Sequence, residues 1–364
     1  MIGLQMADID AWSSRVTVVL GQNPGPFTGP GTNTYLIGTG AGRILLDTGQ
    51  GLPSYLEVLS RALDQSAGRP HLERILLTHA HIDHLGGVES VCARFGPLPT
   101  AKMPWPELDG DLTAQSLAEG ATVTTEGATL RALWTPGHAR DHLCFYMEEE
   151  RALFTGDVVL GAGTTVIPRD GDLAQYLESL RRILELDLAV IYPAHGPAIR
   201  EPYIKVQKIL DHRALRDEQI LEGLAAGVVS VQGLVERIYT DVPQFLHQAA
   251  AVSVEAHLRK HPFGQVRDHH VRGAHQAAHD LAPIRRRRVE RQRALVAVHL
   301  QEERSLAARG DRRDVAVFAA AALFDPDDFG AVLREQGGAV WPGDVASEIE
   351  HPDSVQQCGH RSLT

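Results

Sequence analysis

The sequence predicts an α/β fold in which helices cover β-sheets, and three observations support this prediction. Short runs of β-branched and large aliphatic residues are bounded by Gly, Pro and Asn, which is the pattern of strands. A helical pattern with Leu56, Leu59 and Leu63 on one face lies between two of these runs. Strand, helix, strand is the order of a layered α/β sheet, and the same order recurs in the second half of the chain.

The first half of the chain is expected to contain four strands and one helix. The expected strands are residues 15–20, 34–37, 43–46 and 75–77. The helix is expected over 52–63, so it connects the third strand to the fourth. A loop rich in Gly and Pro separates the first two strands.

The second half repeats the pattern with more helix. The expected strands are residues 128–134, 143–147, 152–154 and 188–192, and the expected helices are 173–186 and 202–225. Shorter helices follow, with Ser230 as an N-cap, Pro243 in a first helical turn and an end near Lys260. We therefore expect a large α/β domain at 1–225 and a small helical module at 226–262.

The composition changes again beyond His261, where scattered histidines precede the run Arg285 to Arg288. The histidines lack a fixed ligand spacing, and a run of like charges usually marks a solvated or disordered segment. We expect residues 263–364 to form a poorly ordered tail, and we infer no function from it.

Composition excludes several classes of protein. The chain has 364 residues, 43% of them hydrophobic, so it is long enough for one large core or several domains. Its formal net charge of -11 argues against a general nucleic-acid coat protein. The N-terminal residues lack the pattern of a secretion signal, and no apolar stretch approaches the roughly 20 residues that span a bilayer. We therefore expect a soluble, cytoplasmic protein without a membrane partner or an obligate protein partner.

The three cysteines are far apart in the sequence and show no CxxC spacing. Cys92, Cys144 and Cys358 are therefore expected to be reduced thiols, because an odd number of isolated cysteines fits neither a disulfide framework nor a cysteine–zinc knuckle.

Side chains that can bind a metal ion are concentrated in one short segment. His79, His81, Asp83 and His84 follow the apolar strand that ends at Leu77. If the strand stays extended, residues two apart point the same way, so His79 and His81 converge on one ion. Asp83 and His84 lie where the chain turns, so we expect their side chains to point at a second ion position next to the first. A fold would gain nothing from three imidazoles and a carboxylate packed here without a metal, so we interpret them as ligands of two ions.

Three further residues occur in similar settings later in the chain. His138, Asp157 and His195 each follow an apolar strand and lie beside a glycine. Rigid scaffolds present functional side chains in this way, on loops at the edge of a sheet.

Together these residues resemble the metallo-β-lactamase superfamily. The pattern consists of His79, His81, Asp83, His84, His138, Asp157 and His195, and the preceding segment 46–49 resembles the first motif of that superfamily. The resemblance implies a four-layer αβ/βα sandwich. It implies one divalent ion held by His79, His81 and His138, a second held by Asp83, His84 and His195, and Asp157 as a bridge between them. The expected metal is zinc.

A closer resemblance is to the β-lactamase-like protein 2 group, over residues of about 15–260. It rests on Asn23-Pro24-Gly25-Pro26, Gly31-Thr32-Asn33-Thr34-Tyr35-Leu36, Glu126-Gly127-Ala128-Thr129-Leu130, Thr135-Pro136-Gly137-His138, Gly156-Asp157 and Tyr192-Pro193-Ala194-His195-Gly196-Pro197. Animal members of that group include a mitochondrial endoribonuclease acting on single-stranded RNA, and their C-terminal helical module is winged-helix-like. This chain departs from the group beyond residue 260, where about a hundred unmatched residues follow.

The resemblance also implies a mechanism. Two bridged ions lower the pKa of a shared water toward about 7, and the resulting hydroxide attacks the substrate. We place Asp83, Asp157 and His142 among the catalytic residues, with His142 either orienting the site or assisting proton transfer. Asp47 is expected to fix the tautomer of a ligand imidazole. Asn33 and Thr164 are weaker candidates for substrate contact.

Three functions are compatible with the sequence. The favoured one is an endoribonuclease or phosphodiesterase on single-stranded RNA. The second is a thioester hydrolase of the hydroxyacylglutathione type, and a bridging Asp157 is typical of both branches, whereas β-lactam-hydrolysing members often carry cysteine there. The third is a nucleic-acid-binding regulatory protein in which residues 226–260 act and the metal site is vestigial.

Overall fold

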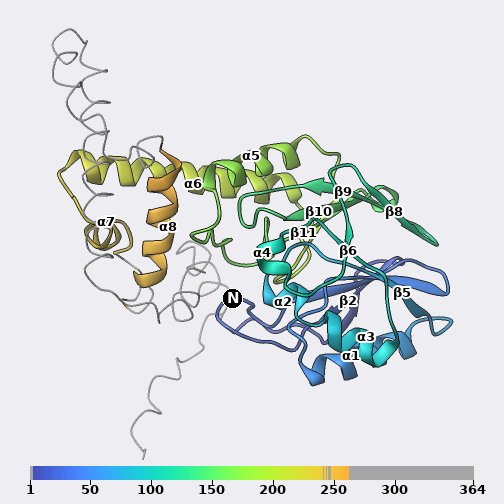
Figure 1. Ribbon diagram of the computed structural model, residues 1–364. Helices are drawn as coiled ribbons and strands as arrows, with labels where there is room; N and C mark the ends of the chain where they lie inside the picture. The colour runs from blue at the N-terminus through green and yellow to red at the C-terminus, as the bar shows by residue number, and fades with distance from the viewer. Residues whose placement is uncertain (1–2, 241, 243, 245–246, 262–364) are drawn as a thin grey trace, which may run out of the picture. The chain divides into compact units, whose positions relative to one another are not determined.

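The structure is a computed structural model that describes residues 3–240, 242, 244 and 247–261. Its core consists of two β-sheets with helices on their outer faces (Figure 1). The predicted tail at 263–364 and the predicted first-turn Pro243 lie outside the described residues.

The first sheet has seven strands in chain order. They are β1 (Ile9–Ala11), β2 (Val16–Leu20), β3 (Asn33–Ile37), β4 (Gly42–Leu46), β5 (His71–Leu76), β6 (Thr100–Lys102) and β7 (Gln115–Ser116). The strands pair antiparallel from β1 to β4 and parallel from β4 to β7. Helix α1 (Pro53–Gln65) makes the crossover from β4 to β5 that a parallel pair requires.

The second sheet has five strands in the order β12-β11-β10-β9-β8. They are β8 (Thr122–Thr125), β9 (Ala128–Trp134), β10 (Leu143–Met147), β11 (Ala152–Gly156) and β12 (Val190–Pro193). The pair β11–β12 is parallel, with helix α5 (Leu173–Leu184) in the crossover, and the other pairs are antiparallel.

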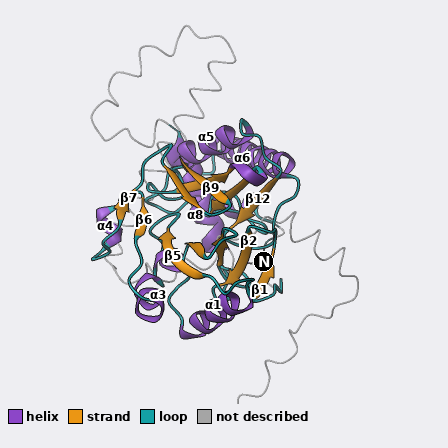
Figure 2. Cartoon of the chain, turned by 90° about the vertical axis from the view of Figure 1, so that its right-hand side faces the viewer, coloured by secondary structure: helices purple, strands orange, loops and turns teal. Residues whose placement is uncertain are grey.

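The alternation of side chains along the strands builds four layers. Tyr35 and Ile37 of β3 pack with Phe145 of β10 in a core between the two sheets, whereas Leu36 faces the opposite way. Leu36 joins a second core beneath α1 and α3 (Val88–Phe95), and a third core lies beneath α5 and α6 (Pro202–Ala225). Figure 2 shows α1 and α3 on one side of the strands and α5 and α6 on the other. The predicted four-layer αβ/βα arrangement is confirmed.

Most predicted elements are found close to their expected bounds. The strands at 128–134 and 143–147 and the helix at 202–225 have the predicted limits. Strand β5 begins at His71 rather than at Ile75, because its first half carries charged residues that hide the apolar pattern. The short elements β1, β6, β7, β8, α2 (Ile82–Leu85), α3, α4 (Pro106–Asp109) and η1 (Glu148–Glu150) are not predicted by the sequence patterns.

The C-terminal module contains α7 (Val231–Ile238), α8 (His247–Lys260) and the end of α6. The side chain of Ser230 accepts a hydrogen bond from the backbone N–H of Gly233, so the predicted N-cap is confirmed. Helix α6 contributes Val206 to the core beneath the second sheet and Leu224 to the core of the module, so one continuous helix belongs to both.

A partly buried carboxylate, that of Asp217, joins α6 to α8. Oδ1 of Asp217 accepts hydrogen bonds from His257 Nδ1 at 3.2 Å and His261 Nε2 at 3.0 Å, and lies 2.9 Å from Lys260 Nζ. Burial opposes ionisation of Asp217, but these donors outweigh it and hold its pKa well below the usual range. Burial of His257 lowers the pKa of its imidazole to about 4, which the hydrogen bond to Asp217 only partly offsets.

This cluster should make the fold sensitive to mild acid. As pH falls from about 6.5 to about 4, the His257 of the unfolded chain takes up a proton that the folded protein does not. The free energy of unfolding should therefore fall through this window by up to about 3 kcal/mol. His257→Asn retains a donor for Asp217 and does not titrate, so the loss of thermal stability between pH 7 and pH 4.5 should be smaller than in the wild type. His71→Asn, at an exposed position on β5, is the control, and an equal pH dependence in all three proteins would contradict the prediction.

Both described cysteines, Cys92 and Cys144, are free thiols, whereas Cys358 lies outside the described residues. In the part of the chain that the structure describes, no helix has the length and apolar character needed to cross a bilayer.

Candidate metal centre

The seven predicted ligands come together in the loops that follow the strands of both sheets. His79 and His81 follow β5, and Asp83 and His84 lie in the short helix α2 that comes next. His138 follows β9, Asp157 directly follows β11, and His195 follows β12. They form two clusters, in each of which the potential ligand atoms lie within 4.8 Å of one another.

The predicted reason for the approach of His79 and His81 is wrong. Strand β5 ends at Leu76, so these residues lie in the loop between β5 and α2 rather than on an extended strand. The loop nevertheless brings them together, and His81 is also the N-cap residue of α2.

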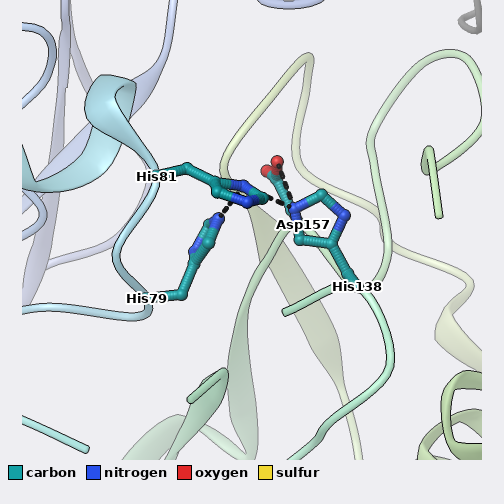
Figure 3. A group of neighbouring side chains, drawn as sticks. All are labelled: His79, His81, His138 and Asp157. Atoms are coloured by element: carbon teal, nitrogen blue, oxygen red, sulfur yellow. Dashed lines mark hydrogen bonds and ion pairs between the residues drawn. The ribbon is translucent and has the colours of Figure 1, made fainter. Parts of the chain in front are cut away.

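The first cluster contains His79, His81, His138 and Asp157 (Figure 3). Nδ1 of His81 lies 2.9 Å from Nε2 of His79 and 3.0 Å from Nε2 of His138. Nε2 of His138 lies 3.4 Å from Oδ2 of Asp157. The four side chains therefore point at one place, each with one donor atom.

The second cluster contains Asp83, His84 and His195, with Asp157 beside it. Oδ2 of Asp83 lies 3.4 Å from Nε2 of His84 and 3.4 Å from Nε2 of His195. Oδ1 of Asp157 lies 3.5 Å from Nε2 of His84 and 3.2 Å from Nε2 of His195. One oxygen of Asp157 thus faces each cluster.

Donor atoms about 2.0–2.1 Å from a tetrahedral zinc ion are about 3.3 Å apart. The separations of 3.2–3.5 Å that involve the two carboxylates are close to this value, whereas the contacts of His81 Nδ1 at 2.9 and 3.0 Å are also hydrogen-bond distances. Nε2 of His84 and Oδ1 of Asp157 are buried and have no hydrogen-bond partner. Because a buried polar atom without a partner is costly, a shared cation is the simplest group that satisfies both.

Hydrogen bonds at the far side of the rings fix which nitrogens face the clusters. A carboxylate oxygen only accepts, so Nδ1 of His84 donates to Asp47 Oδ2 at 2.8 Å and leaves the lone pair on Nε2. The hydroxyl of Thr78 donates to Asp47 and lies 3.0 Å from Nδ1 of His79, which then donates to it. The geometry thus agrees with the tautomer-fixing role predicted for Asp47, and adds Thr78 to it.

His138 is fixed by the backbone instead. Its Nδ1 lies 2.7 Å from the carbonyl oxygen of Val166, which only accepts, so Nδ1 carries the proton and Nε2 faces the first cluster. A carbonyl from the main chain leaves no residue-type signal, which is why sequence patterns do not reveal it.

The two clusters differ in their electrostatics. Burial is the main cause that lowers the pKa of His81, to about 3, so its imidazole is neutral and its lone pair is available. Burial also acts on His195, but Asp157 and Asp83 outweigh it and raise the pKa of His195 to about 9. In the first cluster His79 and His81 are thus neutral, whereas in the second the carboxylates raise the pKa values of His84 and His195 and favour their protonated forms. A metal ion entering the second cluster would displace protons.

His142 lies behind the cluster with both ring nitrogens occupied. Its Nε2 accepts from the backbone N–H of Asp157 at 3.1 Å, and Nδ1 lies 2.9 Å from Thr135 Oγ1. The ring is fully buried. Gly156 has a positive φ of 46°, and a Cβ there would lie 2.5 Å from His142 Nε2, so only glycine permits this approach. The placement favours the orienting role over proton transfer.

Asn33 braces the loop that carries His195. Its side-chain amide donates to the carbonyl oxygens of Pro193 and Gly196, both at 2.8 Å, and Asn33 is fully buried. These contacts favour a supporting role over the predicted substrate contact. Thr164 is partly exposed in the loop between β11 and α5, and its role remains a prediction.

Thr32 is a further supporting residue. Its hydroxyl donates to Asp83 Oδ2 at 3.0 Å and accepts from Asn23 Nδ2 at 3.0 Å. The Gly-Thr-Asn segment at 31–33 thus contacts a predicted ligand through Thr32 and a ligand loop through Asn33.

Comparison with known proteins places this centre in a family. Residues 27–195 match the model of the metallo-β-lactamase superfamily, and residues 230–260 match the β-lactamase-associated winged helix domain. The second match confirms the predicted winged-helix-like module. The crystal structure of a β-lactamase domain protein from Burkholderia ambifaria shares the fold, with a TM-score of 0.62 and 21% identity over 70% of this chain and 88% of that one.

Two relatives with curated names are more similar in sequence. A β-lactamase-like protein 2 homolog from Caenorhabditis elegans is 38% identical over 69% of this chain and 85% of the relative. An atrochrysone carboxyl ACP thioesterase from Aspergillus fumigatus is 38% identical over 65% of this chain and 78% of the relative. The chain therefore belongs to the metallo-β-lactamase superfamily, among relatives that include β-lactamase-like protein 2 homologs, and it is a metal-dependent hydrolase of that superfamily.

Proposed function

We propose that the protein is a dinuclear metal hydrolase that cleaves thioesters. The observation that carries the dinuclear centre is the placement of Asp157, whose Oδ2 faces one donor cluster and whose Oδ1 faces the other. In this assignment His79, His81 and His138 would hold one cation and Asp83, His84 and His195 the other, with Asp157 placed to contact both.

The donor set favours zinc. It combines imidazole nitrogens with carboxylate oxygens and contains no thiolate, which suits zinc or iron better than the oxygen-preferring magnesium or calcium. When bound, two such cations lower the pKa of a shared water toward about 7 and polarise a carbonyl or phosphoryl oxygen.

The chain's own residues then orient the reactants. Asp83 is the less buried of the two cluster carboxylates, with 18% of its side chain exposed against 14% for Asp157, and Thr32 holds its Oδ2. We propose that the carboxylate of Asp83 accepts a proton from the attacking water. The water oxygen forms a bond to the thioester carbonyl carbon, the carbon–sulfur bond breaks, and Asp83 returns the proton to the leaving thiolate. His142 accepts a hydrogen bond from the backbone N–H of Asp157 and so holds this residue in place.

Two observations favour a thioester over RNA. Relatives at 38% and 41% identity carry the name of an acyl-carrier-protein thioesterase. Residues 226–260 contain three acidic side chains, Glu236, Asp241 and Glu255, against three basic ones, Arg237, Arg259 and Lys260, so the module brings no excess of positive charge for a phosphate backbone. The net charge of the whole chain is -11.

Single-stranded RNA remains the second candidate. The same two clusters suit a phosphoryl oxygen as well as a carbonyl oxygen. The match to a winged helix domain over residues 230–260 is the observation that keeps this alternative open. The regulatory alternative with a vestigial site is not retained, because all seven predicted ligands converge.

A side-by-side assay separates the two substrates. We expect the zinc-loaded protein to hydrolyse S-lactoylglutathione or an acyl-phosphopantetheine thioester, and to leave an unstructured RNA oligonucleotide intact. The same preparation of Asp157→Asn is the control for contaminating activity. RNA cleavage that disappears in Asp157→Asn, without thioester turnover in the wild type, would replace the proposed function with the second candidate.

A further inference from the structure

The helical module contacts the loop that fixes His138. Residues 164–169, here called the support loop, lie between β11 and α5. The carbonyl oxygen of Val166, near the middle of this loop, accepts the proton of His138 Nδ1. The carbonyl of Thr165, directly before Val166, and that of Pro168, two residues after it, accept hydrogen bonds from arginines of α6 and α8.

Arg213 of α6 makes the first of these contacts. Its Nη2 donates to the carbonyl oxygen of Thr165 at 2.5 Å, and its Nη1 lies 3.4 Å from Ser253 Oγ on α8. The guanidinium also stacks over the ring of Tyr176 on α5, 5.6 Å from its centroid. Only 3% of Arg213 is exposed. One side chain therefore joins α6, α8, α5 and the support loop.

Residues of α8 make two more contacts. Nη2 of Arg259 donates to the carbonyl oxygen of Pro168 at 3.1 Å. Glu255 Oε2 lies 3.6 Å from Nε of Arg169, at the end of the support loop. The support loop is thus held at Thr165 by α6, and at Pro168 and Arg169 by α8.

A role in packing alone does not explain Arg213 well. Burying a guanidinium removes it from water at a cost, and an apolar side chain of similar volume often stabilises a buried site as well or better. Nε of Arg213 is buried without a hydrogen-bond partner, so the site does not satisfy the side chain fully. What an apolar side chain would not supply is a directed donor to the Thr165 carbonyl, one peptide unit before Val166.

We infer that Arg213 and Arg259 are positioning residues that hold the Val166 carbonyl against His138 and so aim His138 Nε2 at the first donor cluster. Helix α6, together with α8 of the module, then braces the metal centre. The inference rests on the proposed role of His138 as a ligand. It gives the helical module a task within the catalytic domain that needs no nucleic acid.

Arg213→Met tests this inference because it retains a long apolar stem and removes the donors. Arg237→Met is the matched control, because Arg237 is an exposed arginine on the neighbouring helix α7. Arg259→Met breaks the second contact at a less buried position, with 31% of the side chain exposed, and serves if Arg213→Met does not fold. All variants are made in the full chain.

The first measurement needs neither metal nor substrate. In the metal-free protein, NMR should show a slowly exchanging His138 Nδ1 proton, which exchanges faster in Arg213→Met and in Arg259→Met but not in Arg237→Met. The second measurement is zinc affinity by competition with a chelator. The affinity of one of the two sites should fall about tenfold, as is common when a partner behind a ligand is lost, and the other should change little.

An Arg213→Met or Arg259→Met protein that melts at a lower temperature, yet keeps the proton exchange and both zinc affinities, would overturn the inference in favour of a purely structural role. Absence of thioester turnover in the wild type would instead count against the proposed function, because the exchange of the His138 proton does not depend on substrate.

Discussion

Replacing Asp157 with asparagine should lower thioester hydrolysis about a thousandfold, which corresponds to about 4 kcal/mol in the barrier. Oδ2 of Asp157 faces the cluster of His138 and Oδ1 faces His84 and His195. An amide has nearly the same shape, but only its oxygen ligates, and it carries no charge. Asp157→Asn should therefore keep its backbone hydrogen bond to His142 Nε2 while one cluster loses a donor.

The metal content separates this loss from misfolding. We expect Asp157→Asn to retain about one zinc ion per chain where the wild type retains two, by elemental analysis after dialysis. Asp187→Asn is a suitable control, because the side chain of Asp187 is 70% exposed and pairs with Arg151, which precedes β11 at the end opposite to Asp157. Two tightly bound ions together with near-wild-type turnover in Asp157→Asn would show that Asp157 does not bridge.

Three candidate ligands that converge in the structure can be picked out in the sequence because each follows an apolar strand. His138, Asp157 and His195 lie one to four residues beyond β9, β11 and β12, and each lies next to a glycine. The strand fixes the position of the backbone, and the glycine lets it turn. Gly137 illustrates this, since its φ is 131° and a Cβ there would lie 2.3 Å from the backbone nitrogen of Tyr176.

The sequence fails where elements are short or where charge is buried. Strand β6 has three residues and carries Lys102, whose side chain is 1% exposed although lysine normally marks a surface. Lys102 Nζ pairs with Asp109 at 2.5 Å and with Asp141 at 3.0 Å. Asp141 adjoins His142, so this ion group packs next to the centre. Residues 39 positions apart that pair only in the folded protein leave no periodic pattern in one sequence.

The sequence also cannot show how the imidazoles are oriented. The sequence shows that Asp47 is a carboxylate after a strand, but not that its hydrogen-bond partner is His84, because the two residues meet only in the folded protein. The acceptor for His138 is a main-chain carbonyl, which every residue possesses. Ligand identity is thus encoded in side chains, whereas part of the ligand orientation is encoded in the path of the backbone.

Asp47→Asn should weaken metal binding in the second cluster by about 10- to 100-fold and leave the first cluster nearly unchanged. Asp47 has a φ of 60°, in the left-handed region that asparagine tolerates and alanine does not, so the substitution spares the backbone. The amide oxygen can still accept from the backbone N–H of Thr78, which now donates to Oδ1 at 2.8 Å. The amide NH2 group then faces Nδ1 of His84, where the carboxylate oxygen accepted a proton.

That exchange of an acceptor for a donor forces His84 into its other tautomer. Nδ1 must then accept, so the proton moves to Nε2, the atom that faces Asp83 and Asp157. A protonated Nε2 has no lone pair for a cation, although every ligand residue is still present. Competition with a chelator should show one weakened site, and turnover should fall in parallel, whereas Asp47→Ala should add a loss of stability of about 1–2 kcal/mol from the left-handed backbone. If Asp47→Asn bound both zinc ions as tightly as the wild type, the ring of His84 would have to be oriented by a group other than Asp47.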